Sequence, residues 1–204
     1  MPSARPIWPR RAVLPLLLGA GPALALPAEL RFHVLRQGSR IGTHRVAFGG
    51  DAGGLTARTE VDIIVKVLGV VVFRFSHRFE EAWSGDRLLW ATSRRDRNGS
   101  VTEMRAEAGE AGILVQGSAG RFRLPAESAP LSWWDSRRLA GPLFANDTGK
   151  PLDLRWTRRP LPAGGALWQS SGEEVSEGIY AADGRWIGWK TQAEDGSTVT
   201  YEPA

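Results

Sequence analysis

The chain has 204 residues, of which 42% are apolar, 24% charged and 9% aromatic, and it contains 24 Gly, 13 Pro, 9 Trp and no Cys. This composition predicts an ordinary folded protein and excludes a disordered chain. No apolar run approaches the roughly 20 residues of a membrane-spanning helix, so we expect no membrane span. The absence of cysteine excludes disulfide bonds, a thiol nucleophile, Cys-ligated zinc and iron–sulfur clusters.

The first 25 residues have the pattern of a signal peptide. A positive front end precedes the short apolar stretch Ala12–Leu18 and the cleavage pattern Ala23-Leu24-Ala25. We therefore expect an exported, periplasmic protein that is cleaved after Ala25 and forms a single domain over residues 26–204. The paired arginines leave both the Sec and the twin-arginine export routes open. The basic residues of the front end are Arg5, Arg10 and Arg11.

Removal of this leader changes the charge balance. The whole chain has a net charge of +4, but without the three arginines of the leader 23 basic side chains stand against 22 acidic ones. Short basic runs such as Arg94-Arg95-Asp96-Arg97 lie beside turn residues and are typical of solvated loops. Nucleic-acid binding needs many basic groups on one face, so we expect no nucleic-acid partner.

Most of the remaining chain predicts antiparallel β-sheet. Runs rich in Val, Ile, Phe, Trp and Thr alternate in polarity and are separated by Gly, Asn and Asp. A large sheet must curl or pair with another sheet to cover its apolar face and protect its edges. We therefore predict an all-β fold, either a closed or partly open antiparallel barrel or two wrapped sheets. The expected strands cover residues 30–34, 41–48, 55–67, 70–83, 88–95, 100–108, 113–117, 121–124, 152–158, 166–171, 174–181, 185–192 and 197–202.

Two interruptions break this strand pattern. Leu68-Gly69 separates two long strands and predicts a bulge or a tight turn. The segment Pro125–Pro151 is too irregular for a strand. Within it we expect a short helix around Trp133–Ala140, with Ser132 as its cap.

Several short motifs follow one another in an order that resembles a known family. They include Gly38-Ser39-Arg40-Ile41-Gly42-Thr43-His44, Lys66-Val67-Leu68-Gly69, Phe73-Arg74-Phe75-Ser76-His77, Glu81-Ala82-Trp83-Ser84-Gly85-Asp86, Ser132-Trp133-Trp134 and Asp183-Gly184-Arg185-Trp186. Over nearly the whole mature chain, the sequence resembles the exported bacterial proteins catalogued as domain of unknown function 6134. The resemblance implies a periplasmic, β-rich protein, and it brings no established activity and no catalytic residues.

The predicted strand over residues 70–83 places ionisable groups on an apolar face. Alternation puts Phe73, Phe75, His77 and Glu81 on one side of the strand. His77 and Glu81 could serve as a buried acid and base or as the polar anchor of a pocket. A structural hydrogen bond is the simpler explanation, because most buried polar groups are merely hydrogen-bonded.

The irregular segment contains two adjacent tryptophans. Trp133 and Trp134 can form a stacking platform or a lid over an apolar cavity. Alternatively they plug the open end of the barrel as packing mass, which is the commoner role of aromatic side chains.

Motifs of familiar reactions are incomplete in this chain. Gln116-Gly117-Ser118-Ala119-Gly120 lacks the first glycine of a hydrolase elbow, and Gly149-Lys150 lacks the rest of a phosphate-binding loop. The three histidines, His33, His44 and His77, lie on separate predicted strands. We therefore expect no catalytic site, no metal site and no cofactor.

These observations favour a binding protein over an enzyme. Barrels with apolar interiors accept lipids or other apolar ligands. We therefore predict a cell-envelope carrier for an apolar or lipid-like small molecule. The alternatives are a hydrolase-type enzyme that uses His77 and Glu81, and a scaffold for other envelope proteins. The candidate binding residues are Phe73, Phe75, His77, Glu81, Trp133 and Trp134.

Overall fold

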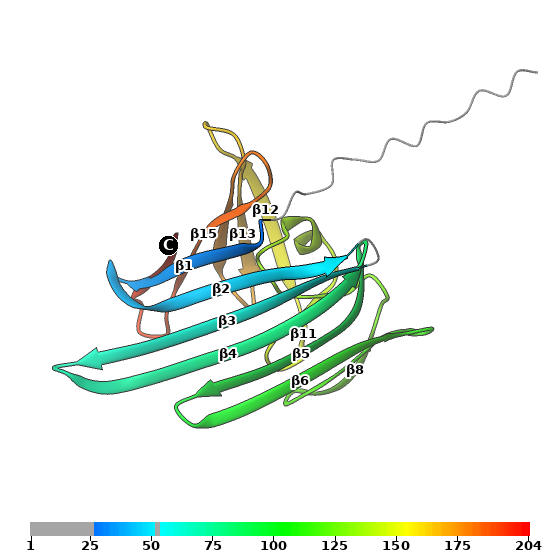
Figure 1. Ribbon diagram of the computed structural model, residues 1–204, viewed down its shortest axis with the longest axis horizontal. Helices are drawn as coiled ribbons and strands as arrows, with labels where there is room; N and C mark the ends of the chain where they lie inside the picture. Colours follow the sequence, from blue (N-terminus) through cyan, green and yellow to red (C-terminus); the bar gives the residue numbers. More distant parts are fainter. Residues whose placement is uncertain (1–26, 52–53) are drawn as a thin grey trace, which may run out of the picture.

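Antiparallel strands make up most of the described chain. The computed structural model describes residues 27–51 and 54–204 (Figure 1), so the expected signal peptide lies outside the described residues. The first eight strands are β1 (Glu29–Arg36), β2 (Ser39–Asp51), β3 (Gly54–Val67), β4 (Val70–Ser84), β5 (Arg87–Arg97), β6 (Ser100–Gly109), β7 (Gly112–Gly117) and β8 (Gly120–Leu124). The last five are β12 (Leu154–Pro160), β13 (Ala166–Gly172), β14 (Ser176–Tyr180), β15 (Trp186–Gln192) and β16 (Thr198–Pro203).

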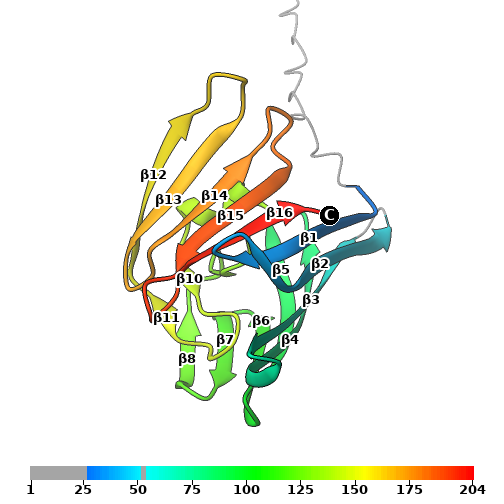
Figure 2. The same ribbon diagram turned by 90° about the vertical axis from the view of Figure 1, so that its left-hand side faces the viewer.

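These thirteen strands form one sheet in the order β12-β13-β14-β15-β16-β1-β2-β3-β4-β5-β6-β7-β8. Each strand pairs with its neighbour in sequence, except that β16 pairs antiparallel with β1 and sets Phe32 opposite Pro203. The sheet is open, with β8 and β12 at its edges. It curls so that β12–β15 and β3–β6 lie on different sides of the molecule (Figure 2). The all-β prediction is confirmed, and the partly open form is the one found, because a twisted sheet of this size curls.

Tight turns join several of the long strands. Leu68 and Gly69 have φ angles of 50° and 82°, so the break predicted between the strands is a tight turn rather than a bulge. Asn98 and Gly99 adopt the same conformation, with φ angles of 53° and 87°. A two-residue turn with positive φ at both central residues has a twist that matches the twist of the flanking strands. Asn suits its first position, whereas Leu adopts positive φ rarely.

The segment between β8 and β12 carries three very short strands and one helical turn. The strands β9 (Ala129–Pro130), β10 (Leu143–Phe144) and β11 (Pro151–Leu152) form a second small sheet. The expected helix is shorter than predicted: it is a 3-10 helix, η1 (Ser136–Ala140), and its cap is Asp135 rather than Ser132. The Asp135 carboxylate accepts a hydrogen bond from the backbone N–H of Arg137, whereas the hydroxyl of Ser132 is donated to Glu81.

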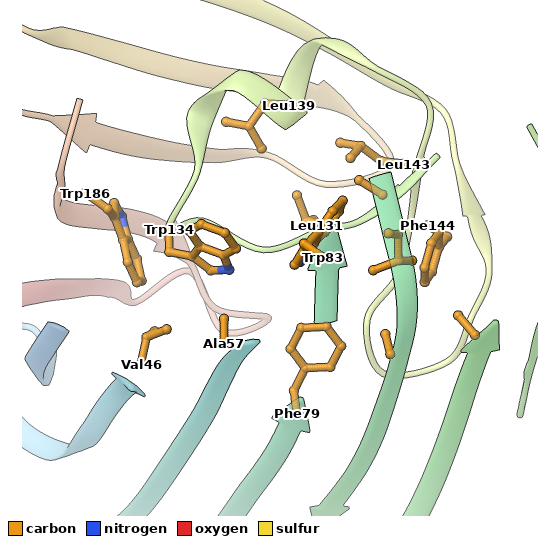
Figure 3. Packing of buried hydrophobic residues seen from close by; sticks show 14 of the residues in the cluster. Val46, Ala57, Phe79, Trp83, Leu131, Trp134, Leu139, Leu143, Phe144 and Trp186 are labelled. Carbon is orange, nitrogen blue, oxygen red and sulfur yellow. The ribbon is translucent and has the colours of Figure 1, made fainter. Parts of the chain in front are cut away.

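This insertion, residues 125–152, fills one end of the curled sheet. Trp134, Leu139 and Phe144 are buried in one apolar cluster with Phe79 and Trp83 of β4 (Figure 3). Trp83 is opposite Leu55 at the start of β3, so the filled end is the one remote from the β3–β4 turn. The filled end is therefore closed by side chains of the insertion. Within the described residues, no helix has the length and apolar character needed to cross a membrane.

Candidate functional site

A groove of about 600 Å³ lies on the inner face of the sheet, at the end that the insertion leaves open. One wall comes from β3 and from the half of β4 next to the turn, and the other comes from β15 and β16. These strands are distant in sequence, and the curl of the sheet brings them to face one another. The large apolar lining residues are Ile41, Ile63, Val65, Phe73, Phe75, Trp189, Val199 and Tyr201.

Strand alternation explains the apolar character of both walls. On β4, Phe73 and Phe75 point to the inner face, and their rings lie nearly parallel with centroids 6.5 Å apart. On the facing wall, the rings of Trp189 and Tyr201 pack with centroids 4.8 Å apart. Each wall thus presents a pair of aromatic side chains to the groove.

Ion pairs lie at the rim of the groove. Arg97 of β5 places Nη2 3.0 Å from Oε1 of Glu194, which precedes β16, and its guanidinium carbon lies 5.6 Å from the centroid of the Phe73 ring. Arg36 of β1 pairs with Asp195. Exposed ion pairs of this kind contribute only about 0–1 kcal/mol each. The rim can therefore exchange these contacts for contacts with a charged ligand group.

Two buried donors at the groove have no hydrogen-bond partner among the described residues. They are Nε of Arg95 and the indole Nε1 of Trp189. Arg95 also forms an ion pair with Asp147 of the insertion. A buried donor without an acceptor costs about 1–3 kcal/mol. An acceptor supplied by water or by a ligand would recover this free energy.

The predicted binding residues of β4 separate along the strand. Phe73 and Phe75 line the groove. His77 lies next on the same face, with its ring centroid 6.3 Å from that of Phe75, and it is buried. Glu81 is fully buried at the filled end and does not line the groove.

The two predicted tryptophans also separate. Trp134 is buried in the core, where its ring packs edge-on against Phe48. Trp133 is half-buried and packs edge-on against Trp156 and against the groove residue Trp189, with centroids 5.6 and 6.0 Å away. Trp134 therefore belongs to the filled end, and Trp133 packs against Trp189 in one wall of the groove.

Between the groove and the insertion lie two buried histidines. His77 Nε2 lies 2.8 Å from Ser93 Oγ on β5. Burial lowers the pKa of His77 to about 4; Asp147 opposes this shift and Arg95 adds to it. Burial also lowers the pKa of His44 on β2 to about 3, with a further contribution from His77. Both imidazoles are therefore neutral at pH 7.

Glu81 joins the insertion to the main sheet. Its carboxylate accepts hydrogen bonds from the indole N–H groups of Trp83 and Trp134, and from the hydroxyl of Ser132 at 3.4 Å. Arg138 of η1 places its guanidinium 3.4 Å from the centroid of the Trp83 ring. Burial raises the pKa of Glu81 to about 7, although these donors and Arg138 favour the charged form.

His77 and Glu81 each have their own partners. Phe79 lies between them along β4, with its ring centroid 6.0 Å from that of His77. Within the described residues, no hydrogen bond joins the side chains of His77 and Glu81. Each therefore has a separate structural role: His77 bonds to Ser93 on β5, and Glu81 bonds to Trp134 and Ser132 of the insertion.

The sequence pattern did not predict the second wall of the groove. Trp189 and Tyr201 lie on strands that were correctly predicted, but alternation along one strand does not indicate which distant strand faces it. The available signal was the pair of large aromatic side chains on neighbouring C-terminal strands. Over residues 27–51 and 54–204, the His, Asp and Glu side chains form no group of three that could hold a metal ion.

Replacement of Glu81 by Leu should destabilise the fold strongly. The change leaves the indole N–H groups of Trp83 and Trp134 buried without their acceptor and removes a negative charge that Arg138 favours, so we expect the free energy of unfolding to fall by about 2–5 kcal/mol. Urea unfolding followed by tryptophan fluorescence measures the effect. Glu81→Gln retains one acceptor oxygen, so its free energy of unfolding should lie between that of the wild type and that of Glu81→Leu. The control is Glu80→Ala, which removes an exposed ion pair with Arg58 and should change stability by less than about 1 kcal/mol. Equal stability of Glu81→Leu and the wild type would contradict the anchoring role.

Acidification should destabilise the wild type through His77. Below pH 6.5 the unfolded chain takes up a proton at His77, whereas the folded chain does so only near pH 4, so stability falls with pH in this window. The loss from this residue between pH 7 and pH 5 is about 2 kcal/mol at most.

Glu81 acts in the opposite direction, because its raised pKa favours the folded state as the pH falls from 7 to 4.5. Urea titrations of the wild type and His77→Gln at several pH values isolate the histidine: the variant should lose less stability on acidification. A parallel pH dependence of the two proteins would contradict burial of a neutral His77.

Two solved structures are similar to this chain to different degrees. The crystal structure of a beta-barrel-like protein of domain of unknown function DUF1849 from Brucella abortus superposes with a TM-score of 0.54 at 10% sequence identity, covering 86% of this chain and 94% of that chain. The crystal structure of a DUF1089 family protein from Pseudomonas aeruginosa gives a TM-score of 0.44 at 14% identity, covering 85% of this chain and 95% of that chain. At such identities the Brucella protein shows similarity of fold alone.

The search of curated proteins gives no match to this chain. Residues 32–204 match the model of one protein family, which confirms the resemblance seen in the order of the sequence motifs. This match includes all of the main sheet except the start of β1. The chain belongs to the family described as domain of unknown function DUF6134.

Proposed function

We propose that this protein is exported to the cell envelope and there binds an apolar or lipid-like small molecule in the groove between β3–β4 and β15–β16. The observation that carries the proposal is an open groove of about 600 Å³ with aromatic side chains on both walls. Small-molecule sites have volumes of roughly 300–1,000 Å³ and mostly apolar walls with a few polar groups. The groove agrees with this description in size and in chemistry.

The two ends of the interior differ in a way that supports a binding role. At the filled end, Trp134 and Phe144 from the insertion cover the inner face of the sheet. At the other end, Phe73 and Phe75 remain partly exposed to the groove. Exposed apolar surface of this kind is unfavourable in water, so a bound apolar group would stabilise the folded state.

The charged rim supports a ligand that also has a polar end. An apolar body would lie against Phe73, Phe75 and Trp189, while an anionic or hydrogen-bond-accepting group would meet Arg36 or Arg97 at the rim. Such a group could replace the carboxylates that now pair with these arginines. The ligand class is therefore an amphiphile rather than a pure hydrocarbon.

Loss of aromatic side chains from the groove should weaken binding of an apolar probe. The probe is 1-anilinonaphthalene-8-sulfonate, which combines an apolar ring system with an anionic group and increases its fluorescence on binding. For Phe73→Ala combined with Phe75→Ala we expect an affinity at least about tenfold lower, because much of the apolar contact area is lost. Leu89→Ala, on an exposed part of β5, is the control and should bind like the wild type. The proposal fails if the wild type does not bind the probe in its folded state, or if the groove variant binds as well as the control. Native mass spectrometry of protein from its own host then identifies the natural ligand.

The export part of the proposal has its own test. The mature chain should begin at Leu26 when the protein is produced in its own host, because Ala23-Leu24-Ala25 fits the cleavage pattern. The intact mass of protein recovered from the envelope fraction measures this start. A mass that corresponds to a chain starting at Met1, with the protein in the cytoplasmic fraction, would contradict export.

A further inference from the structure

The β3–β4 hairpin extends beyond both of its neighbours in the sheet. Pairing of β2 with β3 stops at Gly42 opposite Ile63, and pairing of β4 with β5 stops at Phe75 opposite Arg97. Arg74 is still joined to Asn98 by hydrogen bonds of its backbone N–H and C=O. Beyond Arg74 on β4 and Ile63 on β3, the two strands pair only with each other, up to Val67 opposite Val70. Figure 1 shows this tip at the far left, past the ends of β2 and β5. We refer to residues 64–73 as the hairpin tip.

Large apolar side chains of the tip are exposed on more than one side. Leu68 in the turn is 99% exposed, and Val70 is 65% exposed. Five of the eight large apolar side chains that are exposed in the described chain lie in the tip, and they are Ile64, Val67, Leu68, Val70 and Val72. A cluster of exposed apolar side chains on one hairpin indicates an interaction surface, whereas isolated exposed apolar residues need no explanation.

The turn residue itself is unfavourable for the hairpin. Leu68 adopts a φ of 50°, at a turn position that this protein elsewhere fills with a polar residue, Gln37 before Gly38 and Asn98 before Gly99. Leucine rarely adopts positive φ, and its side chain here contacts neither wall of the groove. Local stability therefore gives no reason for a leucine at this position, while an apolar partner outside the chain does.

The charge around the tip is positive. Residues 63–79 contain no Asp or Glu, in a chain with 22 of them. Lys66 and Arg74 flank the apolar turn, and neither forms an ion pair within residues 27–51 and 54–204. The nearest acids across the groove, Glu194 and Asp195, are each paired with an arginine. Exposed apolar side chains bordered by unpaired basic groups fit a surface with apolar chains below anionic head groups.

We propose that the hairpin tip inserts into the interfacial layer of a lipid bilayer that contains anionic lipid. Leu68 and its neighbours enter the boundary between head groups and acyl chains, and Lys66 and Arg74 contact the lipid phosphates. The tip enters the bilayer only to a shallow depth, because its outer edges carry unpaired backbone groups that cannot enter the hydrocarbon core. The inference does not rest on ligand binding, although Val65 and Phe73 of the tip also line the groove and would bring its mouth to the membrane surface.

A single fluorophore can report directly whether the hairpin tip enters the bilayer. The chain has no cysteine, so Leu68→Cys provides one labelling site for the environment-sensitive dye NBD. We expect a blue shift and increased emission when vesicles of phosphatidylcholine mixed equally with phosphatidylglycerol are added. Val175→Cys is the matched control, because Val175 in the turn between β13 and β14 is 62% exposed, and the emission of a dye at this position should not change. Raising the salt concentration to about 1 M shortens the screening length to about 3 Å and should weaken the response.

Vesicle co-sedimentation of the unlabelled full chain tests the residues. Leu68→Asn creates an Asn-Gly turn, which suits the hairpin, so the variant should fold at least as well as the wild type while binding anionic vesicles about tenfold less. Lys66→Gln combined with Arg74→Gln should also reduce binding about tenfold. The controls are Val175→Asn and, for charge, Arg121→Gln combined with Arg123→Gln on β8, and both should bind like the wild type. All variants share the same N-terminus, so any contribution of residues 1–25 is common to them.

Three results would overturn this inference: no binding of the wild type to anionic vesicles, equal binding of tip and control variants, or a tip that mediates association between copies of the chain instead. The last is read from the mass in solution, where the wild type would be an oligomer and Leu68→Asn a monomer without any difference in vesicle binding. Probe affinity in the groove should be unchanged in Leu68→Asn. Failure of membrane binding and failure of ligand binding are thus distinguished.

Discussion

The structure depends on how one open sheet of thirteen strands covers its inner apolar face. A closed barrel would pair its edge strands with each other and fill its interior from its own strands. Here β8 and β12 remain as edges, so the curl leaves space that the strands alone do not fill. The insertion over residues 125–152 fills that space at one end only, and the groove is what remains at the other end.

The attachment of the insertion rests on a buried polar contact rather than on apolar packing alone. Glu81 lies in the middle of an aromatic cluster, where a carboxylate is tolerated only because several donors converge on it. A carboxylate that accepts from two indoles specifies one arrangement of Trp83 and Trp134, whereas apolar contacts alone would allow several. The polar group at this end therefore fixes geometry, and the apolar groove at the other end is left free of such constraints. Of the two residues that the sequence suggested as a possible acid and base, His77 lies between these two regions and Glu81 lies within the filled end.

Most of the fold could be predicted from alternation and turn residues. The strands of the main sheet, the break at Leu68-Gly69 and the irregular segment all follow from local pattern, because β-strand period and turn chemistry are local properties. The helix around Trp133–Ala140 was overestimated, since Ser132 donates its hydroxyl to Glu81, a residue on another strand. Pairing of β16 with β1, the degree of curl and the wall formed by Trp189 and Tyr201 depend on contacts between residues far apart in sequence, which periodicity does not encode. For this reason Phe73 and Phe75 were correctly placed on one inner face, while their partners across the groove were not identified.

The pairing of β1 with β16 has a consequence for how the chain reaches this structure. Every other neighbour in the main sheet is also a neighbour in sequence, so the two meanders can each form from local hairpins. The seam between them joins segments from opposite ends of the chain; the side-chain hydrogen bond from Arg36 to Ser197 spans 161 positions. Closing so long a loop is entropically unfavourable and slow compared with hairpin formation. The two halves should therefore fold early and independently, and the docking of the last strand onto the first should be the step that limits the folding rate.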